Sequence, residues 1–290
     1  MPNQAAQTAY GPMIVVAAEQ SYPEGQRLVQ DELASQFLPF GLKLLAKFSQ
    51  WPPARDLLLS IAEKRGPGVW GGVLCRKRYI AEKLTEALKD GFRAVVILGA
   101  GLDTLAYRMP ALAVLHVYEV DLPENIVYKR SMLQHLYGKV PAHVNLVAID
   151  FNEQDLGSVL ASHGYPNPQK SFYICEAVTQ YLTDKGVRKI FNFLSKGESG
   201  SQLVFTYVRK DFIEGTNRYG LDALYQTYRV KEQIWQYGIE PEKVGVFIQK
   251  YGWKELEQMG NQAFVEQYVR PSGRHLTVME IERIVHAEKI

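Results

Sequence analysis

Short apolar runs alternate with helical patterns from residue 94 onward, and this alternation constrains the fold more than any other feature of the chain. Residues 94–98 form a continuous apolar run ending at a glycine, as expected for a strand buried on both faces. Strand and helix in repeated succession predict an α/β fold, a mostly parallel sheet with helices on both faces. The later runs are 114–120, 144–149, 171–174 and 201–208, with helical patterns that include 126–137 and 183–195.

Helix signals flank this core. Ile80, Leu84 and Leu88 share one face of a predicted helix over 76–90, and Gly91 is suited to end it. Thr183 is the expected N-cap of the helix over 183–195. We expect one α/β domain over 76–290 with a helical insertion at 209–246, preceded by an N-terminal helical extension or lid over 1–75 that is broken by prolines. Two further strands are expected at 246–248 and 264–269, and a helix at 277–290.

Composition excludes several classes of protein. A formal charge of +2 is too balanced for a chain whose main partner is a polyanion, so no nucleic acid is expected. Cys75 and Cys175 are the only cysteines, too few for a disulfide scaffold or a cysteine-based zinc site, and we expect both thiols to be buried and inert. We see no secretory signal and no window of about 20 apolar residues. The expectation is a cytoplasmic protein with no membrane partner and no metal.

Glycines follow the first predicted strand directly, in the segment Gly99-Ala100-Gly101. Such glycines let a ligand approach the backbone, and the start of the next helix offers free N–H groups. Thr104 stands where the dinucleotide-binding pattern has its third glycine, which disfavours NAD or FAD. A structural turn without a ligand is the alternative.

Acidic residues end the next two predicted strands. Asp121 follows the glycines by about 20 residues, a spacing that suits hydrogen bonds to ribose hydroxyls. Asp150 precedes Phe151, so an adenine ring could stack on the phenyl ring while the carboxylate accepts from the exocyclic amine. The alternative role for Asp150 is a helix cap, for which Asn152 and Asp155 compete. These strand ends favour an adenosine cofactor without a pyrophosphate, namely S-adenosylmethionine.

Four blocks of the chain, in order and spacing from about residue 13 to 194, resemble the leucine carboxyl methyltransferase family. The resemblance implies a Rossmann-like class I methyltransferase fold with a mostly parallel seven-stranded sheet. It also implies S-adenosylmethionine as cofactor and S-adenosylhomocysteine as product, and the ending 283–289 is similar to bacterial members. The blocks are Arg76-Lys77-Arg78-Tyr79-Ile80, 96–108 around the glycines, 118–123 together with Lys129, and 175–182.

The same resemblance implies roles for single residues. Arg76 would bind the methionine carboxylate of the cofactor, a bidentate task for a guanidinium, where the residue pattern alone suggests a solvated helix face. Tyr181 would face the acceptor, with a buried core tyrosine as the alternative. The other cofactor residues would be Gly99, Ala100 and Gly101 along the ligand, Asp121 at the ribose, Asp150 with Phe151 at the adenine, and Glu176 near the amino group.

The acceptor is less well defined by the sequence. Arg274 and His275 cluster near the expected end of the sheet and could hold an anionic acceptor or activate an alcohol, although a surface turn is the alternative. We expect O-methylation of a hydroxyl or carboxyl group on a small molecule, such as a polyketide or peptide natural-product intermediate. A protein carboxyl methyltransferase, an NAD-dependent oxidoreductase and a non-catalytic adenosine-binding module stay open, as do any catalytic base and the oligomeric state.

Overall fold

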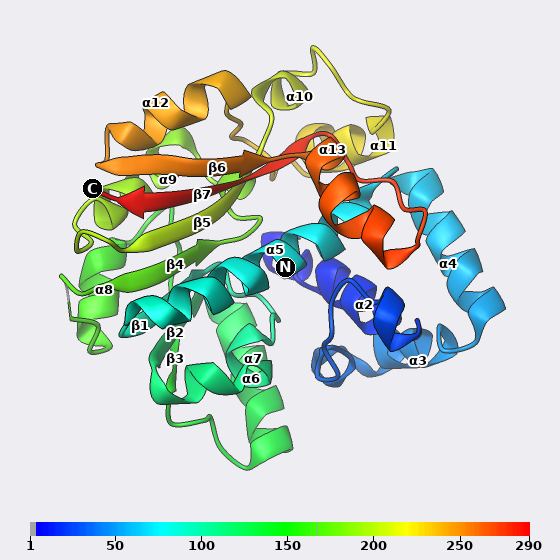
Figure 1. The fold of residues 1–290 in the computed structure, drawn as a ribbon, viewed down its shortest axis with the longest axis horizontal. Coiled ribbons are helices and arrows are strands. Elements are labelled where there is room, and N and C mark those ends of the chain that lie inside the picture. The colour runs from blue at the N-terminus through cyan, green and yellow to red at the C-terminus, as the bar shows by residue number, and fades with distance from the viewer. Residues whose placement is uncertain (1–3, 167) are drawn as a thin grey trace.

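The computed structural model describes residues 4–166 and 168–290. Seven strands form one sheet in the order β3-β2-β1-β4-β5-β7-β6 (Figure 1). The pairs among the first five strands are parallel, and β7 pairs antiparallel with both β5 and β6. The expected α/β fold with a mostly parallel sheet is confirmed. The strands are β1 Ala94–Leu98, β2 His116–Asp121, β3 Val144–Ala148, β4 Ser171–Cys175, β5 Gln202–Val208, β6 Trp253–Met259 and β7 Glu282–Lys289.

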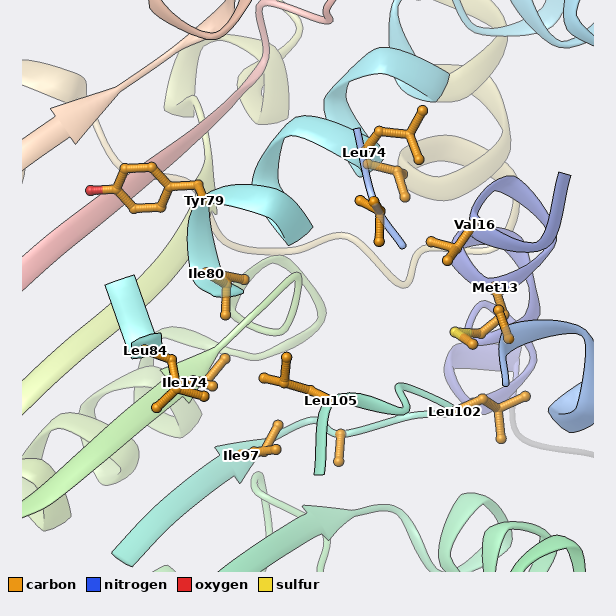
Figure 2. Close-up of a cluster of buried hydrophobic side chains, with 14 of the residues drawn as sticks. Met13, Val16, Leu74, Tyr79, Ile80, Leu84, Ile97, Leu102, Leu105 and Ile174 are labelled. Atoms are coloured by element: carbon orange, nitrogen blue, oxygen red, sulfur yellow. The ribbon is translucent and has the colours of Figure 1, made fainter. Parts of the chain in front are cut away.

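Both faces of the sheet are covered because successive side chains of a strand point to opposite faces. Ile97 of β1 joins a core with helices α2 (Tyr10–Glu19), α5 (Val69–Ala87) and α7 (Pro123–Tyr137). Figure 2 shows Ile80 and Leu84 of α5 on this face, close to Ile97 and Ile174. Side chains of the other face pack against α8 (Leu156–Ser162), α9 (Asp184–Leu194) and α12 (Val244–Gln249).

Helix ends follow the expected signals. The predicted helix over 76–90 is the second part of α5 with a short 3-10 turn, and Gly91 ends it with a φ of 75°. The Thr183 hydroxyl accepts from the Gly186 N–H and so caps α9. The expected domain boundary after residue 75 lies inside α5. The remaining helices are α1 Gln4–Gln7, α3 Phe40–Phe48, α4 Pro52–Arg65, α6 Leu105–Arg108, α10 Lys210–Glu214, α11 Asp222–Tyr225 and α13 Asn261–Phe264.

Three secondary-structure predictions near the C-terminus were wrong. Residues 246–248 belong to helix α12, whose buried Val244 and Ile248 are four apart, a helical spacing. Residues 264–269 form the end of α13 and a π-helix, not a strand. The tail contains strand β7 instead of a helix. Because β7 lies between two other strands, it buries side chains on both faces, and its sequence lacks the alternation that marks a half-buried strand.

Two further expectations from the sequence concern the two cysteines and the lack of a membrane-spanning segment. Cys75 and Cys175 are buried and free, and burial raises the pKa of each thiol to about 12, as expected of inert thiols. Among the residues that the structure describes, no helix is both long and apolar enough to cross a bilayer.

Helix α5 approaches the segment before β7 very closely. A Cβ atom on Gly71 would stand 2.1 Å from the backbone carbonyl oxygen of Thr277. Only a glycine permits this approach, because neither backbone can yield as a flexible side chain would. The contact therefore fixes α5 relative to Glu282, the first residue of β7.

We predict that Gly71→Ala lowers the free energy of unfolding by about 1–3 kcal/mol, because the two backbones must separate. Gly41 in α3 is the matched control: a Cβ there would have nothing within 4 Å. Gly41→Ala should raise the free energy of unfolding by about 0.5–1 kcal/mol, the helix-propensity difference. Urea denaturation of both variants measures the contrast, and changes of the same sign in both would contradict this account of Gly71.

Candidate active site

A cavity of about 490 Å³ lies at the carboxyl ends of the parallel strands. This edge is where open α/β sheets bind their ligands. Residues 5–15 and 69–77 close it from the side of the N-terminal helices, and residues 208–235 contribute from the region expected to be an insertion. The cavity brings together most of the predicted site residues. These are Arg76, Gly99, Ala100, Gly101, Asp121, Asp150, Phe151, Glu176 and Tyr181.

The glycine turn after β1 exposes bare backbone to this cavity. Gly99 has a φ of +72°, and a Cβ on it would stand 2.1 Å from Cγ2 of Val178. The N–H groups of Gly99 and Ala100 donate to the carbonyl of Val120 at 2.7 and 3.1 Å. A larger residue at position 99 would therefore strain the turn and push Val178 away from the cavity wall.

Asp121, at the end of β2, supports the same turn. Its Oδ2 accepts from the Gly101 N–H at 2.6 Å, and its Oδ1 accepts from Leu122 N and Asn125 Nδ2, both at 2.7 Å. A carboxylate offers about four lone-pair directions, so one is left for a ligand. Burial raises the pKa of Asp121, and the three hydrogen bonds oppose that rise.

Asp150 and Phe151 follow β3 at the same edge. Phe151 is buried, and Asp150 is partly exposed and accepts from the Asn152 N–H at 2.9 Å. The helix that follows is capped by Asp155, which accepts from the Ser158 N–H. The alternative role of Asp150, a cap for this helix, is therefore taken by Asp155.

A buried ionic cluster forms the centre of the cavity wall. Arg76 of α5 donates from Nε to Glu176 at 2.8 Å and from Nη1 to Glu282 at 2.7 Å. Lys77 pairs with Glu176 at 3.2 Å and with Asp103. Arg76 and Lys77 are each only 5% exposed, so the alternative of a solvated helix face does not apply to them.

Charge in this cluster is stabilised by pairing. Burial by itself would lower the pKa of Arg76, but Glu282 and Glu176 raise it, so the guanidinium stays charged. Burial would raise the pKa of Asp103, yet Lys77 and Arg108 lower it to below its ordinary value. The cavity is lined by five carboxylates and two cations, a net charge of −3, which favours a positively charged ligand. The carboxylates are those of Asp103, Asp121, Asp150, Glu176 and Glu282.

One carboxylate oxygen in this cluster has no partner. Glu282 is 7% exposed, its Oε2 binds Arg76, and its Oε1 is buried without a hydrogen-bond donor among the described residues. A buried acceptor in that state costs about 1–3 kcal/mol, which a ligand donor can recover. Glu282 therefore marks a position in the cavity where a donor group is favoured.

Aromatic side chains form the other end of the cavity. Tyr181 meets Trp235 edge-on with ring centroids 6.3 Å apart, and Trp235 stacks on Tyr228 at 5.1 Å. Burial raises the pKa of Tyr181 and outweighs the opposing effects of Thr8, Trp235 and Arg76. Tyr181 is thus a neutral phenol that lines the cavity near Glu282, not a core tyrosine remote from it.

Two predicted acceptor-side residues are absent from this cavity. Arg274 pairs with the buried Glu19 of α2 at 2.5 Å and lies over the ring of Tyr22 at 3.7 Å, so it joins the C-terminal segment to an N-terminal helix. His275 is exposed. The segment before this pair is helical instead of the expected strand, which moves the pair away from the sheet edge.

Sequence reasoning also missed several residues of the cavity. Asp103 lies in the recognised glycine block and Lys77 beside Arg76, so their charges gave a usable signal. Glu282 and Trp235 gave none, because each reaches the cavity only through long-range packing. Glu119, the other acid of the β2 block, is instead fully buried with Lys129 at 2.8 Å.

Comparisons with known proteins identify the family of this chain. The model of a family described as leucine carboxyl methyltransferase matches residues 9–195. Relatives in Mycobacterium marinum and Bacillus subtilis are both 35% identical, over 46% of this chain and 44% of their own length. Their names give S-adenosyl-L-methionine-dependent methyltransferase as an inferred activity and state no acceptor. The chain therefore matches less than half the length of these relatives.

A solved structure supports the fold separately. A DUF574 family protein from Streptomyces avermitilis aligns with a TM-score of 0.58 at 14% identity, over 83% of this chain and 92% of that one. At this identity the likeness concerns the fold alone. Because the family model covers more than half of the residues, the chain belongs to the leucine carboxyl methyltransferase family, whose cofactor is S-adenosylmethionine.

Proposed function

We propose that this protein is an O-methyltransferase that methylates a hydroxyl group on a small molecule with an aromatic or apolar scaffold. The observation that carries the proposal is one continuous cavity with two chemically different ends. One end holds the glycine turn and the acids of the strand ends. The other holds the aromatic wall, next to the central ionic cluster with the unpartnered oxygen of Glu282.

The first end fits the cofactor of the family. Asp121 retains a lone pair for a ribose hydroxyl, and Phe151 with Asp150 offers a flat apolar face beside an acceptor. Arg76 would bind the cofactor carboxylate and Glu176 its ammonium group, which means that the present Arg76–Glu176 contact is shared with the ligand. The net charge of −3 also favours a sulfonium cofactor, which is positively charged overall.

The second end favours a hydroxyl over a carboxylate as acceptor. The only cations that line the described cavity, Arg76 and Lys77, are both already paired with carboxylates. An acceptor carboxylate would therefore meet like charge without a free partner. A hydroxyl can instead donate to Glu282 Oε1, the buried oxygen that lacks a donor.

The chemistry then divides simply among the residues. The cofactor, when bound, supplies an electrophilic methyl group on a positive sulfur. Glu282 accepts the proton of the acceptor hydroxyl, so that the oxygen lone pair is free to form its new bond to carbon. Arg76 orients the Glu282 carboxylate through its Oε2. Tyr181 and Trp235 hold the acceptor scaffold, and residues 5–15 exclude water from that side.

The alternatives are distinguishable. Membership of the family removes the NAD-dependent oxidoreductase. A protein carboxyl methyltransferase would need a free cation for the chain terminus, and a non-catalytic adenosine-binding module would bind the cofactor without turnover.

We further propose that the N-terminal helices act as a lid, and that the two free cysteines reflect a cytoplasmic location.

Cofactor binding gives the first prediction for this function. S-adenosylhomocysteine at about 100 times its dissociation constant should stabilise the protein by about 2.7 kcal/mol, a rise in melting temperature of roughly 5 °C. Arg76→Ala and Asp150→Ala should each abolish most of this rise, because each removes a group that holds the cofactor. The measurement is a thermal melt with and without the ligand.

Arg78→Ala is the matched control for Arg76. Arg78 is on the same helix and pairs with Glu82 at the surface, outside the cavity, so this variant should keep the full rise. Arg76→Ala breaks two buried ion pairs and can destabilise the fold by about 3–5 kcal/mol, so Asp150→Ala, at a partly exposed position, provides the independent test. An undiminished rise in both variants would disprove the assignment.

The role of Glu282 gives the second prediction. With labelled S-adenosylmethionine and a panel of phenols and benzoic acids that share the same rings, label should pass to the phenols. Glu282→Gln should then lower kcat by about 10²–10⁴-fold, because an amide cannot take the proton. Its melting-temperature rise with S-adenosylhomocysteine should persist.

Other outcomes select other functions. Transfer to the benzoic acids alone, undiminished in Glu282→Gln, would identify a carboxyl methyltransferase and refute the hydroxyl proposal. Tight binding of S-adenosylhomocysteine without transfer to any acceptor in the panel would favour the non-catalytic module.

A further inference from the structure

Helices α3 and α4 expose an unusual number of large apolar side chains. We define the apolar hairpin surface as Phe40, Leu44, Leu45, Phe48, Trp51, Leu57 and Ile61. These are half of the fourteen exposed large hydrophobic residues in the described chain, within a stretch of 22 residues. Phe40 is 83% exposed, Trp51 65% and Phe48 60%. A concentration of this kind marks an interaction site, whereas scattered exposed apolar residues do not.

The side chains project from an ordered element. Phe40, Leu44 and Phe48 follow one another at a spacing of four and so form one stripe along α3. The opposite side of α3 is anchored, since Ala46 is buried and Leu42 packs on the core. Figure 1 shows α3 and α4 at the edge of the molecule away from the sheet. The apolar stripe therefore faces outward on a fixed helix.

Basic residues border this surface. Residues 40–65 contain five basic and two acidic residues, a net charge of +3 in a chain of formal charge +2, so the rest of the chain carries −1. Lys43, Lys47, Lys64 and Arg65 have no ion pair among the described residues. Phe, Trp and Leu side chains beside unpaired lysines are the composition of helices that lie in the plane of a bilayer surface.

We propose that the apolar hairpin surface inserts into the headgroup region of an anionic phospholipid bilayer. The apolar stripe would enter the boundary between headgroups and acyl chains, while the lysines contact lipid phosphates. A second copy of this chain fits less well, because a two-fold contact would bring the unpaired lysines of both copies together. This surface lies in the plane of a bilayer and does not cross it, so the proposal departs from the expectation of no membrane partner, which rested on the lack of a long apolar segment.

The position of the surface connects it to the cavity. Helix α3 packs against α2, and Pro12, Met13 and Val15 of α2 line the cavity. Attachment to a bilayer through α3 would hold this wall of the cavity near the lipid surface, where apolar acceptors concentrate. Membrane binding itself does not depend on the proposed methyl transfer and can be tested without an acceptor.

The test is co-sedimentation of the full chain with vesicles of phosphatidylglycerol and phosphatidylcholine, and with vesicles of phosphatidylcholine alone. We expect binding to the anionic vesicles that weakens as salt is raised. Trp51 is the one exposed tryptophan, since Trp70, Trp235 and Trp253 are buried, so a blue shift of tryptophan emission on adding vesicles reports its insertion.

Variants separate the contribution of the apolar side chains from that of the lysines. Leu44→Ser with Phe48→Ser should lower the vesicle affinity at least about tenfold, and Lys43→Gln with Lys47→Gln by roughly fivefold per lysine. Val114→Ser with Val127→Ser is the matched control, at positions 88% and 69% exposed outside the surface, and should not change the affinity. All variants should keep the thermal response to S-adenosylhomocysteine.

Three results would overturn the proposal. One is absence of binding to anionic vesicles. Another is binding that the Leu44→Ser, Phe48→Ser variant does not weaken. The third is a dimer in analytical ultracentrifugation that the same variant dissociates, because the surface would then be covered by a second copy of the chain.

Discussion

The guanidinium of Arg76 holds together three parts of the molecule that are remote in the sequence. It lies between Glu176, just after β4, and Glu282, at the start of β7, and it comes from helix α5. A buried charge without partners costs several kcal/mol, so these three elements have to meet in the folded state. The same contacts place two carboxylates at the centre of the cavity. Stability of the sheet edge and chemistry of the site therefore depend on one side chain.

The parts of the fold that could be predicted are those determined by local patterns. The runs that became β1 to β5 are apolar and bounded by turn residues, and Gly91 and Thr183 carry local signals for helix ends. The C-terminal third lacked such signals. Glu282 to Lys289 is a strand because β5 and β6 surround it, and no short-range periodicity records that environment.

The residues of the site also divide into those that local patterns predict and those that only tertiary packing brings to the cavity. Residues on the first four strand ends were predicted because a parallel sheet brings its carboxyl ends together whatever the intervening sequence. Glu282 and Trp235 enter from segments whose placement depends on tertiary packing, and Arg274 was misplaced for that reason. The sequence therefore predicted the residues at the glycine and acid end of the cavity, and few of those at its aromatic end. The four blocks that carry the family resemblance end near residue 194, so they gave no information on the acceptor end.

The place of β7 in the sheet also has a consequence for synthesis of the protein. This strand occupies an interior position, yet it is made after all the other strands of the sheet, and Arg274 and Glu282 leave the ribosome long after Glu19 and Arg76. Until then, one edge of β5 is unpaired, Glu19 lacks its salt-bridge partner Arg274, and Arg76 has only Glu176 of its two partners. A nascent chain is therefore exposed to edge-to-edge association until β7 has been made, and the cavity acquires its last wall only then.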